Sequence, residues 1–402
     1  MGTVREPTFE NALAFAQDLI RIPSPSGGEE DVARRVIEEY EALGFEDVRT
    51  DDVGNAIGVV KGSGDAPSVL LNCHLDVVAE GDHSEWEFPP FSGAVENGFL
   101  HGRGAMDIKG PLALQTYAAA TLTGRARGDI IVAHTVFEER GGLGMQRLLD
   151  SGLAPGAVVI GESTHGDVCI GHRGRGEIEV VIHGQAGHAS VPGRAANALD
   201  LVPAVLTAVR ELAENQAEDP MLGRSTLVAT GVDVLPESRN VIPDKVTVVV
   251  DWRVLPEATH EWMEQTIEEA VRAEVGDLPE GLTVEVRMAA QPQTTYTGLT
   301  SKRSLFTPGF VMDSDDPVVR AAAQAVGQRD GDGPATVRPW AFATDGGWSC
   351  GVHGIPTVGF APGEERYAHT NRERLDLDEA RWTFERYPLL IDAVHEALLR
   401  GV

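Results

Sequence analysis

The most informative stretch of the sequence begins with VLLNCHLDVV at residues 69–78 and resumes with GRGAMDIKG at residues 102–110. An apolar run leads into His74 and Asp76, which are two residues apart. A glycine-rich turn then carries a second carboxylate, Asp107. We interpret this stretch as the floor of a metal site.

Apolar strand patterns alternate with helical patterns on both sides of this stretch. Helical spacing is seen at residues 8–21 and 32–43, and the pair Ser26 and Glu29 before the second helix predicts an S-x-x-E capping box. Strand-like runs occur at residues 56–60, 69–73, 129–137, 157–161 and 356–360. This alternation predicts an α/β fold whose sheet is at least partly parallel.

A different order of elements interrupts this pattern in the middle of the chain. It comprises a strand at 177–183, a helix at 195–215, strands at 225–234 and 245–254, a helix at 259–275 and a strand at 282–288. This βαββαβ order predicts an inserted ferredoxin-like domain at 176–290 within a domain made of 1–175 and 291–402. Pro203 and Pro388 fall inside predicted helices and should bend or interrupt them.

Polar residues follow the apolar strands at the point where each strand ends. His74, Glu138, Glu139 and Glu162 occupy such positions, and His369 follows the last strand after a short loop. In open α/β sheets this carboxyl edge is where ligands bind. Any one of these residues is weak evidence, because a lone histidine is usually structural and Glu138 with Glu139 would also fit a solvated turn.

The combination of side chains points to metal binding. Five carboxylates gathered in one cleft would repel one another unless cations were present. The five are Asp76, Asp107, Glu138, Glu139 and Glu162. Imidazole and carboxylate ligands without a thiolate suit a catalytic zinc, cobalt or manganese site. We therefore expect two divalent ions.

Composition limits the possible partners and the location. The chain has 402 residues and a net charge of −29, which disfavours nucleic acid and anionic membranes as partners. No apolar run is long enough to span a bilayer, and the N-terminus lacks the pattern of a signal peptide. Three widely separated cysteines indicate reduced thiols. We expect a cytoplasmic protein.

The motifs together resemble the M20 family of co-catalytic metallopeptidases, which includes acetylornithine deacetylase, succinyl-diaminopimelate desuccinylase, aminoacylase-1 and carboxypeptidase G2. Within the family, residues 296–299 and 354–360 look most like those of the YgeY-like hydrolases. The resemblance covers nearly the whole chain. It rests on residues 74–78, Trp86 with 89–91, 102–104, Asp107 with 109–110, 138–139, 161–162, 187–190, Asn240 with Pro243, and 368–369.

The resemblance implies a zinc-peptidase-like catalytic domain with a mixed, largely parallel sheet and an inserted lid and dimerisation domain. It implies that zinc is the metal, with cobalt or manganese as alternatives. His74 and Glu162 would hold one ion, Glu139 and His369 would hold the other, and Asp107 would bridge them. Asp76 would fix the imidazole of His74 by bonding its far nitrogen, and Glu138 would be the general base. The Asp107–Ile108 peptide bond would be cis.

The resemblance also implies roles for the inserted domain and for one late turn. His188 would reach across a homodimer to stabilise the oxyanion, and Arg253 and Asn240 would hold a substrate carboxylate. For Arg253 a surface ion pair with a nearby acid remains an alternative. Thr344, Asp345 and Gly346 would line the substrate pocket, and for them an ordinary glycine turn remains an alternative.

The function implied is hydrolysis of the amide bond of an N-acyl amino acid or short peptide, as in deacetylases, desuccinylases, carboxypeptidases and dipeptidases. Two alternatives stay open. One is N-carbamoyl amide hydrolysis on the same scaffold, and the other is a non-catalytic M20-like binding protein.

Overall fold

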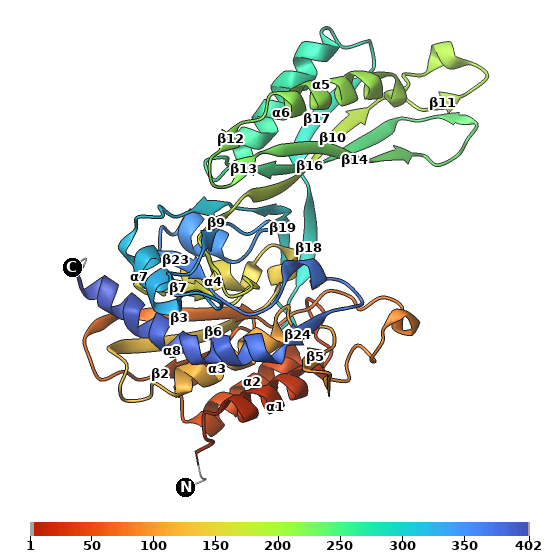
Figure 1. Cartoon of the computed structure of the whole chain (residues 1–402). Coiled ribbons are helices and arrows are strands. Elements are labelled where there is room, and N and C mark those ends of the chain that lie inside the picture. The colour runs from red at the N-terminus through yellow and green to blue at the C-terminus, as the bar shows by residue number, and fades with distance from the viewer. Residues whose placement is uncertain (1–3, 401–402) are drawn as a thin grey trace. The chain divides into compact units, whose positions relative to one another are not determined.

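The computed structural model describes residues 4–400, which divide into two compact units (Figure 1). The first unit contains residues 4–172, 293–301 and 310–400. The second unit contains 173–292 and 302–309. The helices are α1 Phe9–Ile20, α2 Glu30–Leu43, α3 Lys109–Ala120, α4 Leu143–Asp150, α5 Val202–Glu214, α6 His260–Val275, α7 Pro317–Val326 and α8 Leu377–Arg400.

The first unit is built on an eight-stranded sheet with the order β1-β2-β6-β3-β7-β23-β8-β22. Its four adjacent strands β6, β3, β7 and β23 run parallel, whereas β1, β2 and β6 pair antiparallel. The sheet is therefore mixed, as the sequence predicts. The strands are β1 Glu46–Thr50, β2 Ala56–Val60, β3 Ala66–His74, β6 Gly128–Thr135, β7 Ala157–Ile160, β8 Val168–Cys169, β22 Val337–Arg338 and β23 Thr357–Gly359.

The central strand β3 is apolar because both faces of the sheet are covered. Val69, Leu70 and Leu71 are all fully buried, although neighbouring side chains point to opposite faces. Leu70 packs in one cluster with Met145 of α4. Helices α1, α2, α3 and α8 lie together on the other face (Figure 1).

The parallel strands also explain where the polar residues meet. β6, β3 and β7 are neighbours, so their carboxyl ends lie at the same edge of the sheet. β3 ends at His74, β6 ends shortly before Glu138, and β7 ends shortly before Glu162. Side chains that are far apart in the sequence are thereby brought together.

The second unit has the predicted βαββαβ order. Its antiparallel sheet runs β14-β16-β10-β17, with β20 also pairing with β10. Buried side chains of β16, including Val248 and Trp252, pack with Val205 of α5 and Met263 of α6. The strands are β10 Gly174–His183, β14 Thr226–Leu235, β16 Lys245–Val254, β17 Thr283–Met288 and β20 Phe306–Thr307.

The structure corrects one sequence expectation about proline. The predicted helix at 195–215 begins only at Val202, after two short 3-10 turns, so Pro203 lies in its first turn. The first turn tolerates proline because its N–H groups have no intrahelical partner. Pro388 lies inside α8, as the sequence predicts, and the helix is not interrupted between Leu377 and Arg400.

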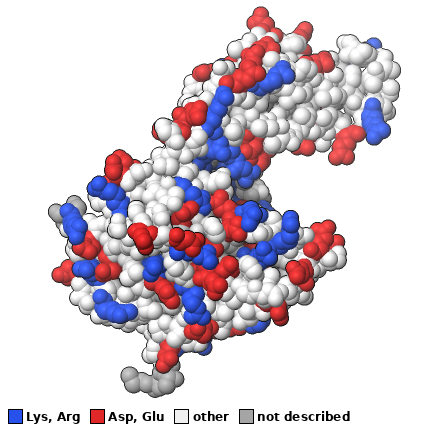
Figure 2. Space-filling view, in the orientation of Figure 1, with Lys and Arg blue, Asp and Glu red and all other residues white. Residues whose placement is uncertain are grey.

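Short strands complete the described chain. They are β4 Ala94–Glu96, β5 Phe99–His101, β9 Gly171–His172, β11 Gly187–His188, β12 Glu218–Asp219, β13 Gly223–Arg224, β15 Val241–Ile242, β18 Ala290–Thr294, β19 Thr300–Ser304, β21 Phe310–Val311 and β24 Arg374–Asp376. Among residues 4–400, no helix combines the length and apolar character needed to cross a membrane. Figure 2 shows acidic side chains interspersed with basic ones over both units.

Candidate metal centre

Two groups of potential metal ligands share Asp107. His74, Asp107 and Glu162 form one group, and Asp107, Glu139 and His369 form the other. The Nε2 atom of His74 lies 3.2 Å from Asp107 Oδ1 and 3.1 Å from Glu162 Oε1. The Nε2 atom of His369 lies 3.2 Å from Asp107 Oδ2 and 3.1 Å from Glu139 Oε2. One carboxylate oxygen of Asp107 thus faces each group.

The charges of the centre perturb one another strongly. Burial would lower the pKa of His74, but the neighbouring carboxylates, Asp107 first among them, raise it well above its ordinary value. Hydrogen bonds to Asp107 and Glu139 raise the pKa of His369 to about 10. Burial, reinforced by the charge of Asp107, raises the pKa of Glu162 to about 7.

These shifts fit a centre that holds divalent cations. When anionic ligands lie close together without a metal, their charges favour protonated histidines and raise the pKa of neighbouring glutamates. A divalent ion would take the place of the histidine protons, since metal binding requires neutral imidazole. The donors are nitrogen and oxygen atoms only, the set that suits zinc, cobalt or manganese.

The carboxylate of Asp76 lies closer to the backbone of the neighbouring turn than to His74. The Nδ1 atom of His74 lies 2.8 Å from the backbone oxygen of Asp76 and 3.5 Å from its carboxylate. The carboxylate itself accepts the N–H groups of Glu138 at 3.0 Å and Glu139 at 3.3 Å. Asp76 therefore links the orientation of His74 to the turn that carries the two glutamates.

Glu138 lies beside both ligand groups and belongs to neither. Its Oε2 atom is 4.0 Å from His74 Nε2, and burial raises its pKa well above the ordinary value. The preceding residue, Phe137, has a left-handed backbone with φ of 58°. This conformation costs a non-glycine residue about 1–2 kcal/mol, so the surroundings must hold it in place.

A buried ion pair between Arg103 and Glu373 holds the backbone at Asp107. The sequence patterns did not indicate this pair. Glu373 accepts the N–H groups of Met106 at 3.1 Å and Asp107 at 3.0 Å, and it accepts a hydrogen bond from Arg103. Both charged side chains are almost completely buried. Burial raises the pKa of Glu373 to about 7, against the opposing effect of Arg103. The Asp107–Ile108 peptide bond is cis, as the resemblance implies.

The Glu373→Ala variant should be strongly destabilised. It leaves the buried Arg103 unpaired and removes the acceptor for two backbone N–H groups, which should cost about 3–5 kcal/mol of unfolding free energy. Urea denaturation measures the loss. As a control, Asp392→Ala breaks the exposed Arg127–Asp392 pair and should change stability little. Equal losses in the two variants would contradict the structural role of Glu373.

The sequence-predicted S-x-x-E capping box is not formed. Glu29 is the N-cap residue of α2, but no side chain caps the helix. Ser26 instead donates to Asp76 Oδ2 at 2.6 Å, and the carboxylate of Glu29 accepts the N–H groups of Gly27 and Phe137. Ser26 thus bonds to Asp76, and Glu29 bonds to the turn at Phe137, both beside the candidate metal centre.

The candidate substrate residues of the second unit lie on its surface. His188 and Asn240 are exposed and close together, since β11 pairs with β15 and Ala189 N donates to Asn240 O at 3.1 Å. His188 Nδ1 lies 2.7 Å from Ser190 Oγ. Arg253 donates to Asp251 at 2.7 Å, which is the ion pair that the sequence left as an alternative.

The turn at 344–346 is buried in the first unit. Thr344 and Asp345 are at most 1% exposed. Asp345 accepts a hydrogen bond from Thr135 at 2.8 Å, and burial raises its pKa to about 6. Thr344 Oγ1 accepts the N–H of Gly346 at 3.0 Å. These side chains make internal contacts, and Asp345 adds to the negative charge around Glu138.

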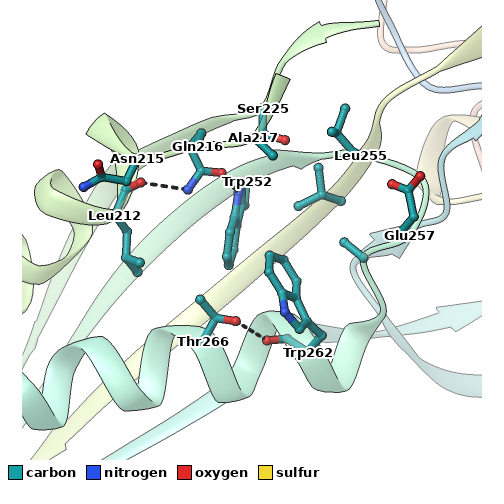
Figure 3. A pocket seen from close by; sticks show the side chains of 12 residues that line it. Leu212, Asn215, Gln216, Ala217, Ser225, Trp252, Leu255, Glu257, Trp262 and Thr266 are labelled. Atoms are coloured by element: carbon teal, nitrogen blue, oxygen red, sulfur yellow. Dashed lines mark hydrogen bonds between the residues drawn. The ribbon is translucent and has the colours of Figure 1, made fainter. Parts of the chain in front are cut away.

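A cavity of about 430 Å³ in the second unit is separate from these residues. Trp252 and Trp262 lie beside each other in its wall, with ring centroids 5.1 Å apart (Figure 3). Trp252 donates to Gln216 at 2.7 Å. None of the predicted ligands or catalytic residues lines this cavity.

Comparison with known proteins agrees with this centre and fold. The model of peptidase family M20/M25/M40 matches residues 70–392, which is most of the chain. The chain therefore belongs to this family, as the sequence predicts. Membership makes it a metallohydrolase of amide or peptide bonds.

Individual relatives support the same assignment. The chain is 32% identical over 368 residues to the uncharacterized protein YgeY of Escherichia coli K12, covering 90% of this chain and 88% of the relative. It is 31% identical over 315 residues to succinyl-diaminopimelate desuccinylase of Methylorubrum extorquens, covering 72% and 78%. The fold is similar to that of the Bacillus subtilis YXEP protein, a dinuclear metal binding peptidase, with a TM-score of 0.69, 15% identity and coverage of 96% and 98%.

Proposed function

We propose that this protein is a dinuclear metal-dependent hydrolase of N-acyl amino acids or short peptides. The observation that carries the proposal is the pair of ligand groups that share Asp107, with Glu138 beside them and outside both. His74 and Glu162 would hold one ion, Glu139 and His369 the other, and Asp107 would lie between them. The desuccinylase relative, whose name states that it removes a succinyl group, supports an acyl amino acid as substrate.

In the proposed reaction, Glu138 transfers the proton and Asp76 holds Glu138 in position. When bound, the ions would polarise the substrate carbonyl and lower the pKa of the attacking water. Glu138 takes a proton from that water as its oxygen bonds to the carbonyl carbon, and then gives the proton to the amine nitrogen as the C–N bond breaks. Asp76 holds the turn of Glu138 in place during both transfers.

The second unit would form the contact of a homodimer, and its residues would take part in the reaction of the partner subunit. His188 would donate a hydrogen bond to the oxyanion, and Asn240 with Arg253 would hold the substrate carboxylate. Exposed apolar side chains on β14 support a subunit contact, because Val228, Val232 and Leu235 are 56%, 43% and 49% exposed. Figure 2 shows few charged side chains over β14. We place this dimer in the cytoplasm.

Metal removal tests the proposal. Exhaustive treatment with a chelator should abolish hydrolysis, and zinc, cobalt or manganese should restore it, because the proposed reaction needs the ions to polarise the carbonyl and to activate the water. Hydrolysis of a panel of N-acyl amino acids, N-carbamoyl amino acids and dipeptides measures the activity. Undiminished activity after chelation would reject the metal mechanism. Turnover of the N-carbamoyl compounds alone would favour the carbamoyl alternative, and no turnover at all would favour a binding protein.

A further inference from the structure

The segment of residues 24–29 forms hydrogen bonds with the residues that follow His74. Ser24 donates to the backbone oxygen of Leu75 at 2.8 Å, and Val77 N donates back to Ser24 O at 2.9 Å. Ser26 donates to Asp76 at 2.6 Å. The segment is thus attached to the residues that follow the ligand His74 at the end of β3.

Glu29 connects this segment to the turn that carries Glu138 and Glu139. Its side chain is fully buried. One carboxylate oxygen accepts the N–H of Gly27 at 2.9 Å, and the other accepts the N–H of Phe137 at 3.3 Å. Burial raises the pKa of Glu29 to about 7, and the charge of Asp76 adds to this rise. A buried acid group therefore serves as an acceptor of two backbone hydrogen bonds.

Three successive backbone N–H groups of the turn point at two buried carboxylates. The N–H of Phe137 is bound by Glu29, and those of Glu138 and Glu139 are bound by Asp76. Successive N–H groups of a turn form a concave site for anionic oxygen atoms. Phe137 has the left-handed backbone in this turn, and it is the residue held by Glu29.

We propose that Glu29 is a positioning residue, which holds the backbone of Phe137 so that the two following glutamates leave the turn toward the metal centre. This inference rests on the proposed function, in which Glu138 is the base and Glu139 a ligand. Glu29 touches neither ligand group, so its effect passes through the turn.

Because of the position of Glu139, we expect a change at Glu29 to weaken the binding of one ion more than that of the other. Glu139 belongs to only one of the two ligand groups, the one completed by Asp107 and His369. In the other group, His74 belongs to β3 and Glu162 follows β7, so the turn itself carries neither ligand. A displaced turn should therefore weaken one ion far more than the other.

The test compares Glu29→Ala and Glu29→Gln with Glu39→Gln. Glutamine keeps the size of the side chain but places an N–H donor against a backbone N–H. Glu39 is an equally buried carboxylate of α2 whose partners are Arg5, Arg35 and Tyr117, away from the turn. It controls for general loss of stability. The metal-free proteins are titrated with Co²⁺ alone by absorbance and calorimetry, and kcat and KM are measured after saturation with the metal.

We expect the Glu29 variants to lose about 10- to 100-fold in the affinity of one Co²⁺ ion, with the other nearly unchanged. Their kcat should fall by about 10²-fold, with little change in KM, because Glu138 is displaced from its substrate. Glu39→Gln should show neither effect. If Glu29→Ala does not fold, the isosteric Glu29→Gln carries the test.

Equal weakening of both ions, or unchanged affinities in a folded Glu29 variant, would overturn the proposal. The same selective loss in Glu39→Gln would overturn it as well. A failure of the proposed function is distinguishable, because the parent protein would then bind Co²⁺ without hydrolysing any amide. The selective loss of one ion would still report on Glu29 in that case.

Discussion

The Glu138→Gln variant is expected to bind both metal ions and to lose about 10²- to 10⁴-fold in kcat. Glu138 lies outside both ligand groups, so its removal leaves the ligands in place. Burial raises the pKa of its carboxyl group, which favours the form that carries a proton. Glutamine keeps the shape of the side chain and cannot carry the proton.

Metal analysis of the purified variant, together with kcat and KM for the best substrate of the panel, measures this outcome. Glu10→Gln is a matched control, since Glu10 is an exposed residue of α1 paired with Arg381. The control should behave like the parent protein. A kcat near that of the parent in Glu138→Gln would remove Glu138 from the role of base. Loss of metal in the same variant would instead make Glu138 a ligand.

The sequence predicts the gathering of the ligand residues because of one topological rule. Each of His74, Glu139 and Glu162 follows an apolar strand, and parallel neighbouring strands end at the same edge. For these three residues, strand order is the further information needed. The structure supplies that order, with β3 between β6 and β7.

The supporting residues of the centre could not be predicted from local patterns. Ser26 and Glu29 form an S-x-x-E sequence whether they cap a helix or reach residues 50 and 108 positions away. The choice depends on which backbone N–H groups are left without partners in the folded chain. Here the strained turn at Phe137 provides one, and Asp76 accepts the hydroxyl of Ser26.

The contacts of Glu373 could not be predicted from local patterns either, because its partners are even farther away in the sequence. Its partners Arg103 and Met106 are 270 and 267 positions away in sequence. A charged pair in the sequence gives no sign that it will be buried, because charged residues are usually exposed. Only the fold shows that this pair holds the backbone of Asp107.

Asp107 is expected to be the one ligand whose loss removes both ions. Its Oδ1 atom faces His74 and its Oδ2 atom faces His369, each at 3.2 Å. The charge of Asp107 also contributes to the raised pKa of Glu139 and of Glu162. It is therefore the negative charge that both groups have in common.

The Asp107→Asn variant should consequently bind neither ion at concentrations that saturate the parent protein, and its hydrolysis should fall to the level of the chelated enzyme. His369→Ala should keep the group of His74, Asp107 and Glu162 and bind one ion. Metal content after dialysis and Co²⁺ titration measure both outcomes. Asp129→Asn, which alters a half-exposed pair with Lys61, is the control and should bind two ions. Two ions in Asp107→Asn would mean that the groups do not depend on a shared carboxylate, whereas none in His369→Ala would mean that the two ions bind only together.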